Sequence, residues 1–265
     1  MENGGEMMPK KAVNYNQVEL MASVAAKLLE DNKSVLVGTG LPVLASMLAQ
    51  RSNAPNILIM YEAGGVGSQA SVVPVSVGES RTFYHGIAAS SMHDVMSALQ
   101  GGFVDYGFLG AAQIDMYGNI NTTVIGDYDT PKVRLPGSGG ANDAGSLCFK
   151  TIILMKQDTK RFVKKLDFLT TPGYLTGPGA REKAGLPPDT GPYRVISQLG
   201  AYGFDNNTKK MMLLSTHPNV SIEEIKENCS FELTIPVNVE TSKEPTDQEL
   251  KILRQIDPMK IVIGK

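Results

Sequence analysis

Residues 56–69 constrain the fold more than any other stretch, because an apolar run ends there on one carboxylate and a glycine-rich turn. Residues 57–61 are apolar without alternation, which predicts a strand buried on both faces, as in a parallel sheet covered by helices. Glu62 then falls at the carboxyl end of that strand, where open α/β sheets place their ligands. The glycines after it leave room for a substrate and for backbone N–H groups. We therefore expect a reactive carboxylate at Glu62.

Two other interpretations apply to the same stretch. A glutamate at the end of a strand is most often a solvated charge, and this alternative stays open. Residues 65–70 also fit the string G-x-G-x-x-G/A, which is the dinucleotide-binding fingerprint. That fingerprint requires a helix directly afterwards, whereas residues 71–78 are rich in β-branched side chains and contain Pro74. We therefore reject the nucleotide site.

The chain before Glu62 predicts a strand–helix–strand unit. Asn16 and Glu19 resemble a capping box, and helical spacing continues to about Asn32. Residues 34–37 predict a buried strand, and a second helix should end before Asn53. Two strands joined in this way should lie parallel with a right-handed crossover. The Gly38-Thr39-Gly40 turn between them could hold a phosphate, although a structural turn is favoured.

After Glu62 the pattern predicts a helix from Arg81 to Gln100, a strand at 104–110, another at 151–155 and a basic connector at 160–165. The histidines at 85 and 93 lack a third ligand at metal-binding spacing, so we expect no metal site. Four prolines and four glycines make 176–192 an expected irregular surface excursion.

The last third of the chain predicts two antiparallel strands, 194–197 and 211–215, around a turn at 205–207. His217 lies in a further turn, which favours a structural role over a catalytic one.

Composition bounds the class of protein. The 265 residues suit one large domain, expected at 16–265 after a tail at 1–15 that lacks the layout of a signal peptide. A net charge of −2 argues against nucleic acid and anionic membranes as partners, and no apolar run could span a bilayer. Two cysteines suit a reducing compartment. We expect a cytoplasmic α/β enzyme.

Residues 110–143 contain too many small, polar and glycine residues for a simple connection, so they should wrap a ligand or contact another chain. Backbone N–H groups of Gly137 to Gly140 could point at a developing negative oxygen, as in an oxyanion hole. Lys132 and Arg134 could contact phosphates, or could simply be exposed charges.

The motifs of this region, together with those at 35–42 and 170–182, resemble the smaller (B) subunits of glutaconate-type enzymes among the family I CoA-transferases. The matching residues include Gly110-Ala111-Ala112-Gln113-Ile114-Asp115, Gly118-Asn119-Ile120-Asn121, Pro131-Lys132, Gly137-Ser138-Gly139-Gly140-Ala141-Asn142, Thr170-Thr171-Pro172-Gly173 and Gly177-Pro178-Gly179-Ala180-Arg181-Glu182. The resemblance implies a single α/β domain on a mostly parallel sheet flanked by helices. It also implies a larger A subunit as partner.

The resemblance further implies ping-pong transfer of CoA between carboxylic acids, with acyl-CoA and a carboxylate as substrates and no metal or permanently bound cofactor. The nucleophile of the family is a glutamate followed by a small residue and glycine, and Glu62-Ala63-Gly64 stands at that place. Ala63 departs from the serine expected there, which could alter the acyl pocket. Further site residues implied are Gly137, Gly139, Gly140 and Asn142 for the oxyanion or CoA, and Gly64, Gln113, Lys132 and Arg134 as CoA or substrate contacts.

Two alternatives remain beside the transferase. Relatives of this kind include decarboxylases of glutaconyl-type CoA esters and hydrolases of ring-containing CoA esters. In the decarboxylase relatives the nucleophilic glutamate is replaced, so the presence of Glu62 favours transfer. A non-catalytic role in support of a partner is the second alternative. Among acids, the resemblance suggests a short dicarboxylate such as glutaconate.

Overall fold

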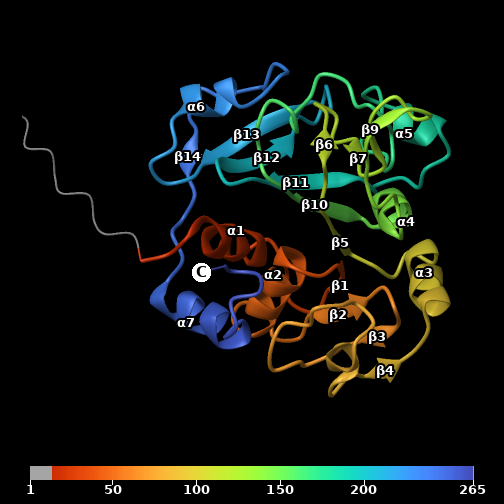
Figure 1. Cartoon of the computed structure of the whole chain (residues 1–265), viewed down its shortest axis with the longest axis vertical. Helices are drawn as coiled ribbons and strands as arrows, with labels where there is room; N and C mark the ends of the chain where they lie inside the picture. Colours follow the sequence, from red (N-terminus) through yellow and green to blue (C-terminus); the bar gives the residue numbers. More distant parts are fainter. Residues whose placement is uncertain (1–13, 265) are drawn as a thin grey trace, which may run out of the picture.

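A computed structural model describes residues 14–264, so the expected tail at 1–15 lies almost wholly outside the described residues. The chain forms an α/β fold around a ten-stranded sheet with the order β14-β13-β12-β11-β10-β5-β1-β2-β3-β4 (Figure 1). Its five central strands are parallel to one another: β11 (Pro192–Ile196), β10 (Lys150–Leu154), β5 (Tyr106–Leu109), β1 (Ser34–Val37) and β2 (Leu58–Tyr61). The predicted fold class, a mostly parallel sheet flanked by helices, is confirmed.

Antiparallel strands extend both ends of the parallel centre. β3 (Gly65–Val66) and β4 (Ala88–Ala89) continue from β2. On the other side β12 (Gly200–Phe204) and β13 (Met211–Thr216) continue from β11, and β14 (Glu240–Thr241) pairs parallel with β13.

The predicted pairing of the strands at 194–197 and 211–215 is wrong. The turn at 205–207 joins β12 to β13, and β12 separates β13 from β11. The sequence of β12, Gly-Ala-Tyr-Gly-Phe, contains two glycines and therefore has a weak strand propensity. Pairing with two neighbours stabilises it as a strand in the folded protein.

Helices cover both faces of the sheet. On one face α1 (Gln17–Ala26), α2 (Leu41–Gln50) and α7 (Asp247–Ile256) contact one another (Figure 1). On the other, α3 (Met92–Gln100), α4 (Ala141–Leu147) and α6 (Ile222–Glu227) contribute to a second core. Val35 and Val37 belong to the first core and Leu36 to the second, which explains why the strand is apolar without alternation.

The capping box of Asn16 and Glu19 is present at the start of α1, as predicted. The helix ends at Ala26, however, and not near Asn32. Leu29 lies in the following turn and is still buried, so the apolar spacing continues beyond the end of the helix.

The predicted helix from Arg81 to Gln100 is wrong over its first half. Residues 80–83 form a short 3₁₀ turn, 88–89 form β4, and only Met92–Gln100 is α-helical. Ser91 begins that helix by accepting a hydrogen bond from the Asp94 N–H in a capping box. His85 and His93 are both exposed.

The glycine-rich region at 110–143 forms two small hairpins outside the main sheet. Their strands are β6 (Gln113–Ile114) with β7 (Ile120–Asn121) and β8 (Val124–Gly126) with β9 (Pro131–Arg134). The expected irregular excursion at 176–192 contains the short helix α5 (Ala180–Lys183), and its Arg181 is only 3% exposed. That prediction is therefore wrong in part, because one long charged side chain of this segment is buried.

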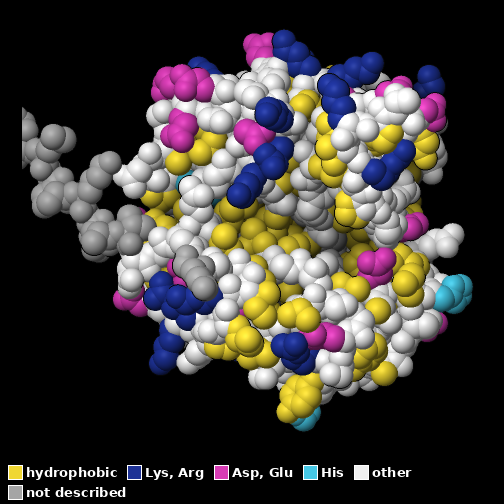
Figure 2. Space-filling view, in the orientation of Figure 1, with side chains coloured by type: hydrophobic (Ala, Val, Ile, Leu, Met, Phe, Trp, Pro, Cys, Tyr) yellow, Lys and Arg dark blue, Asp and Glu magenta, His cyan; other side chains and the backbone are white. Residues whose placement is uncertain are grey.

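On the face shown in Figure 2, hydrophobic side chains gather in the middle, and Lys and Arg side chains lie both directly above them and along the rim. Within residues 14–264, no helix combines the length and the apolar character needed to cross a membrane.

Candidate active site

Glu62 lies in a tight turn directly after β2. The Gly64 N–H donates to the Tyr61 carbonyl at 2.9 Å and closes the turn. Gly64 has a φ of +115°, and a Cβ on it would lie 2.1 Å from the Ser90 carbonyl oxygen. Only glycine fits this position. Glu62 is half-buried, and its backbone is held between a buried strand and the segment that precedes α3.

The amino-terminal end of α4 contacts the Glu62 carboxylate. The Gly140 N–H donates to Glu62 Oε1 at 3.1 Å, although the two residues lie 78 positions apart. A Cβ on Gly140 would lie 3.0 Å from the same oxygen. The absence of a side chain at Gly140 therefore allows the carboxylate to reach the backbone. The two glycine-rich stretches singled out in the sequence thus meet at one point.

A cavity of about 630 Å³ opens beside this contact. Its walls come from the carboxyl ends of β1, β5 and β10, from the turn after β1, and from the start of α4. The lining residues that bear on the chemistry are Gly38, Thr39, Glu62, Ser138, Gly139 and Gly140. This is the edge of a parallel sheet at which ligands bind.

A second cavity, of about 640 Å³, shares Gly110, Pro136, Ser138 and Ala141 with the first. Lys160 and Arg161 line it, and Arg161 forms an ion pair with Asp158. The prediction of a basic connector at 160–165 misses the place of these two residues at the site. The available signal is their position just after β10, whose carboxyl end adjoins that of β5.

The structure separates the predicted oxyanion residues into two groups. The Gly137 N–H donates to the Thr122 carbonyl at 2.9 Å, and the Asn142 side chain donates to the Thr170 carbonyl at 2.9 Å. The Gly137 N–H and the Asn142 side chain therefore hold the loop in place. The Gly139 N–H has no partner among the described residues, and the Gly140 N–H contacts Glu62. Gly139 and Gly140 are the backbone donors available beside the carboxylate.

The other predicted contacts do not line the Glu62 cavity. Gln113 is buried and donates to Asp167 Oδ2 at 3.0 Å. Lys132 and Arg134 are exposed on β9, where Arg134 lies 4.9 Å from the centroid of the Tyr128 ring. Gly64 contributes to the turn itself.

The motif at 115–119 is explained by a hydrogen-bond network. Asp115 accepts the backbone N–H groups of Tyr117 and Asn119, and Asn119 accepts the N–H groups of Gly173 and Leu175. Burial raises the pKa of Asp115. This part of the sequence pattern holds two loops together and does not reach the cavity.

The Cys148 thiol does not line the Glu62 cavity. Cys148 is buried, and burial raises the pKa of its thiol to about 12, which opposes a role as a nucleophile. Among residues 14–264, no group of three or more His, Cys, Asp and Glu side chains is placed to hold a metal ion.

The site is a half-buried carboxylate that accepts a backbone N–H and faces a cavity at the edge of a parallel sheet. In an α/β protein such a site suits carboxylate or acyl chemistry. Residues 18–228 match the family described as Coenzyme A transferase. The chain belongs to this family.

Three comparisons support that assignment. The chain is 39% identical to the B subunit of glutaconate CoA-transferase of Acidaminococcus fermentans, over 92% of this chain and 94% of that one. It is 37% identical to the B subunit of 3-oxoadipate CoA-transferase of Pseudomonas knackmussii, with the same coverage. The crystal structure of glutaconate coenzyme A-transferase from A. fermentans superposes with a TM-score of 0.91 at 36% identity, covering 96% of this chain and 100% of that chain.

Proposed function

We propose that this chain is the catalytic B subunit of a CoA-transferase that moves CoA between an acyl-CoA and a short dicarboxylic acid. The observation that carries the proposal is the contact of the Gly140 N–H with Glu62 Oε1 at the mouth of a cavity. A solvated surface carboxylate would have no need of a glycine that admits it to a helix amino terminus.

The proposed reaction begins with attack of the Glu62 carboxylate on the thioester carbonyl of the donor. The carbon–sulfur bond breaks, and CoA leaves as a thiolate while a mixed anhydride forms. The thiolate then attacks Cδ of Glu62 and releases the donor acid as a carboxylate. Glu62 now carries CoA as a thioester, and an acceptor carboxylate reverses these steps. Charge and atoms balance without an outside oxidant, reductant or metal.

The position of Gly140 suits the second step. Attack at Cδ converts one Glu62 oxygen into a tetrahedral oxyanion, and Oε1 already accepts the Gly140 N–H at 3.1 Å. A preorganised donor at such an oxygen lowers the barrier by about 3–4 kcal/mol in well-studied enzymes. Gly139, with its unpaired N–H in the described structure, is the second donor that we propose for the same negative charge.

The combined length of the two cavities supports CoA as the ligand. The two cavities run along the carboxyl edge of the sheet from β2, past β1 and β5, to the segment after β10. Three strand spacings of about 4.8 Å separate β2 from β10, which gives about 14 Å. An extended pantetheine arm has about 12 bonds in line, which at the ~1.2 Å per bond of an extended polypeptide gives a length on the order of 15 Å. Lys160 and Arg161 would then lie near the CoA phosphates.

The proposed acid and partner rest on the relatives. Both relatives described above are B subunits, and both carry the name of a dicarboxylic acid. We infer a separate A subunit that completes the acyl pocket. Exposed apolar side chains near the Glu62 turn support a partner on that side: Ile87 is 79% exposed and Met92 is 54% exposed. These two residues lie on either side of Ser90, whose backbone packs against Gly64.

The test is mass spectrometry of the chain, copurified with its A subunit, after incubation with an acyl-CoA and rapid quenching. We expect a CoA adduct on the peptide that contains Glu62. Glu62→Gln should abolish the adduct and lower turnover by about 10⁴-fold or more, because the nucleophile is lost. Glu62→Asp keeps a carboxylate but withdraws it from Gly140, so a partial loss is expected.

The matched control is Glu30→Gln, which makes the same change of charge at an exposed residue before β1, on the opposite edge of the sheet. Its turnover should equal that of the unmodified chain. Consumption of acyl-CoA without any adduct would contradict the transferase and favour a decarboxylase or hydrolase. Unchanged turnover in Glu62→Gln would instead indicate a supporting subunit.

A further inference from the structure

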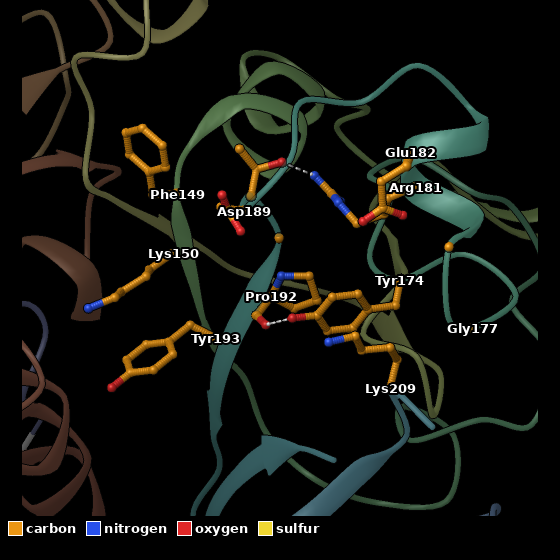
Figure 3. Close-up of a pocket in the computed structure, with 13 residues that line it drawn as sticks. Phe149, Lys150, Tyr174, Gly177, Arg181, Glu182, Asp189, Pro192, Tyr193 and Lys209 are labelled. Atoms are coloured by element: carbon orange, nitrogen blue, oxygen red, sulfur yellow. Dashed lines mark hydrogen bonds between the residues drawn. The ribbon is translucent and has the colours of Figure 1, made fainter. Parts of the chain in front are cut away.

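Arg181 is a buried cation that the reaction described above does not use. It is 3% exposed and lies on α5, beside a cavity of about 310 Å³ at the amino-terminal edge of β10 and β11 (Figure 3). Its acidic neighbours Glu182 and Asp189 are exposed, and neither forms an ion pair with it. Burial lowers the pKa of the guanidinium. A buried charge without a carboxylate partner is costly, so its contacts call for an explanation.

Those contacts are almost all with backbone carbonyl groups. Arg181 Nη2 donates to the carbonyl oxygens of Gly145 and Ser146, at 3.2 and 3.1 Å, near the carboxyl end of α4. Arg181 Nη1 donates to the carbonyl oxygens of Pro172 and Gly173, at 3.2 and 2.8 Å. One side chain therefore ties the end of a helix to a neighbouring loop segment.

The same loop segment contacts α4 at two further points. The Asn142 side chain donates to the Thr170 carbonyl, in the first turn of the helix. In the middle of the helix, a Cβ on Gly145 would lie 2.1 Å from Cγ2 of Thr171. Thr171 also exchanges backbone hydrogen bonds with Ile120 of β7. The segment is thus a rigid support along the length of α4, and Arg181 closes its far end.

The other end of α4 is the one that contacts Glu62. Gly140 precedes the helix, and its N–H donates to Glu62 Oε1. The seven residues of α4 rise about 10 Å in total. A shift of the helix along its axis would therefore move the Gly140 N–H by the same amount, and a shift near 1 Å would lose the hydrogen bond.

We propose that Arg181 is a positioning residue for the reaction: by fixing the carboxyl end of α4 against residues 172–173, it sets the place of the Gly140 N–H at Glu62. This inference rests on the proposed function. It concerns a residue outside the Glu62 cavity, so its effect should appear in the chemical step and leave the binding of substrate nearly unchanged.

The experiment uses the complex with the A subunit and the variants Arg181→Lys and Arg181→Gln. Steady-state kcat and KM for the acyl-CoA are measured, together with the single-turnover rate of CoA adduct formation on Glu62. We expect kcat and the adduct rate to fall together, ~10- to 100-fold in Arg181→Gln. KM should stay within about threefold. Arg181→Lys, which keeps the charge, should recover part of the loss.

A milder variant guards against failure of the fold. Thr190 Oγ1 accepts a hydrogen bond from Arg181 Nη2 at 2.8 Å. Thr190→Val removes this acceptor with little change of shape, so a smaller fall in kcat is expected. The matched controls are Arg254→Lys and Arg254→Gln, because Arg254 donates to Glu19 and Asn14 in the α1–α7 region, away from α4. Their kcat should be unchanged.

If the Arg181 and Thr190 variants unfold at lower temperature but keep the kcat and adduct rate of the unmodified complex, Arg181 is only a structural residue and the inference fails. The proposed function is judged separately, by the adduct on the unmodified chain. If the unmodified chain formed no CoA adduct, the thioester mechanism would be overturned. Turnover of the acyl-CoA in the variants would still show whether Arg181 affects the rate.

Discussion

Two glycine-rich stretches meet at Glu62, and they use glycine for different reasons. Directly after β2, at Gly64, Gly65 and Gly67, the backbone is packed so closely that a side chain would have no space. A Cβ on Gly64, Gly65 or Gly67 would lie 2.1, 2.2 or 2.7 Å from a neighbouring atom. In the loop before α4 a Cβ on Gly137 would meet, apart from its chain neighbours, no atom of the described residues within 4 Å, and one on Gly139 would lie 3.8 Å from Glu62 Oε1.

The first set of glycines serves the fold, and the second serves the reaction that we propose. Glycines in the first stretch are required by the fold, because Ser90 and Thr82 backbone atoms occupy the space that side chains would take. In the second stretch, Gly139 and Gly140 border the cavity and keep the approach to the carboxylate open. A sequence pattern alone treats both as flexible glycine turns. The variants below should separate them by which measurement changes.

The largest effect on stability is expected for Gly64→Ala. The new Cβ would clash with the Ser90 carbonyl and would hold alanine at a φ of +115°. We expect a loss of about 3 kcal/mol or more in the free energy of unfolding. Urea titration of the chain checks this, and a loss below about 1 kcal/mol would show that the turn can relax and would weaken the comparison.

Gly140→Ala should lower kcat and leave stability nearly unchanged. Its φ is −78°, which alanine adopts freely, but its Cβ would lie 3.0 Å from Glu62 Oε1 and 2.9 Å from Met96 Cε. Met96 can move, whereas a displaced carboxylate loses its place for attack. We expect kcat to fall about 100-fold. Stability should change by no more than about 1 kcal/mol.

Steady-state kinetics and urea titration on the same preparation test Gly140→Ala. A variant with normal kcat would contradict the role of this contact in the reaction. A variant that is strongly destabilised would instead place Gly140 in the same class as Gly64.

Gly137→Ala should have the smallest effect. Its φ is +92°, so alanine carries backbone strain of about 1 kcal/mol or somewhat more. Apart from the chain neighbours, no atom between residues 14 and 264 lies within 4 Å of the new Cβ, and the hydrogen bond from the Gly137 N–H to the Thr122 carbonyl can be kept. Thermal unfolding should therefore show a modest loss, and kcat should stay within about twofold. A large fall in kcat would assign Gly137 to the reaction, as expected from the sequence.

Much of the parallel centre of the sheet could be predicted from the sequence. The strands at 34–37 and 58–61 are buried on both faces, and this requirement leaves a local trace, an apolar run without alternation. The capping box at Asn16 is equally local. The candidate carboxylate follows from the same logic, because the carboxyl end of a parallel strand is a place defined by the strand itself.

The predictions that failed concern structure that depends on residues elsewhere in the chain. Strand β12 exists because two neighbouring strands pair with it, and its own glycines oppose a strand. The burial of Arg181 depends on carbonyl groups from α4 and from residues 172–173, which lie far from it in the sequence or carry no side-chain signal.

The amino-acid order is sufficient for the class of fold, the place of Glu62 and the family resemblance. Tertiary packing selects which backbone N–H faces the carboxylate. Gly137, Gly139 and Gly140 lie within four positions of one another and offer the same chemical groups, but Thr122 takes the first N–H and Glu62 takes the last. The physical reason is that hydrogen bonds act over about 3 Å and are set by packing, whereas the sequence records only which groups are available.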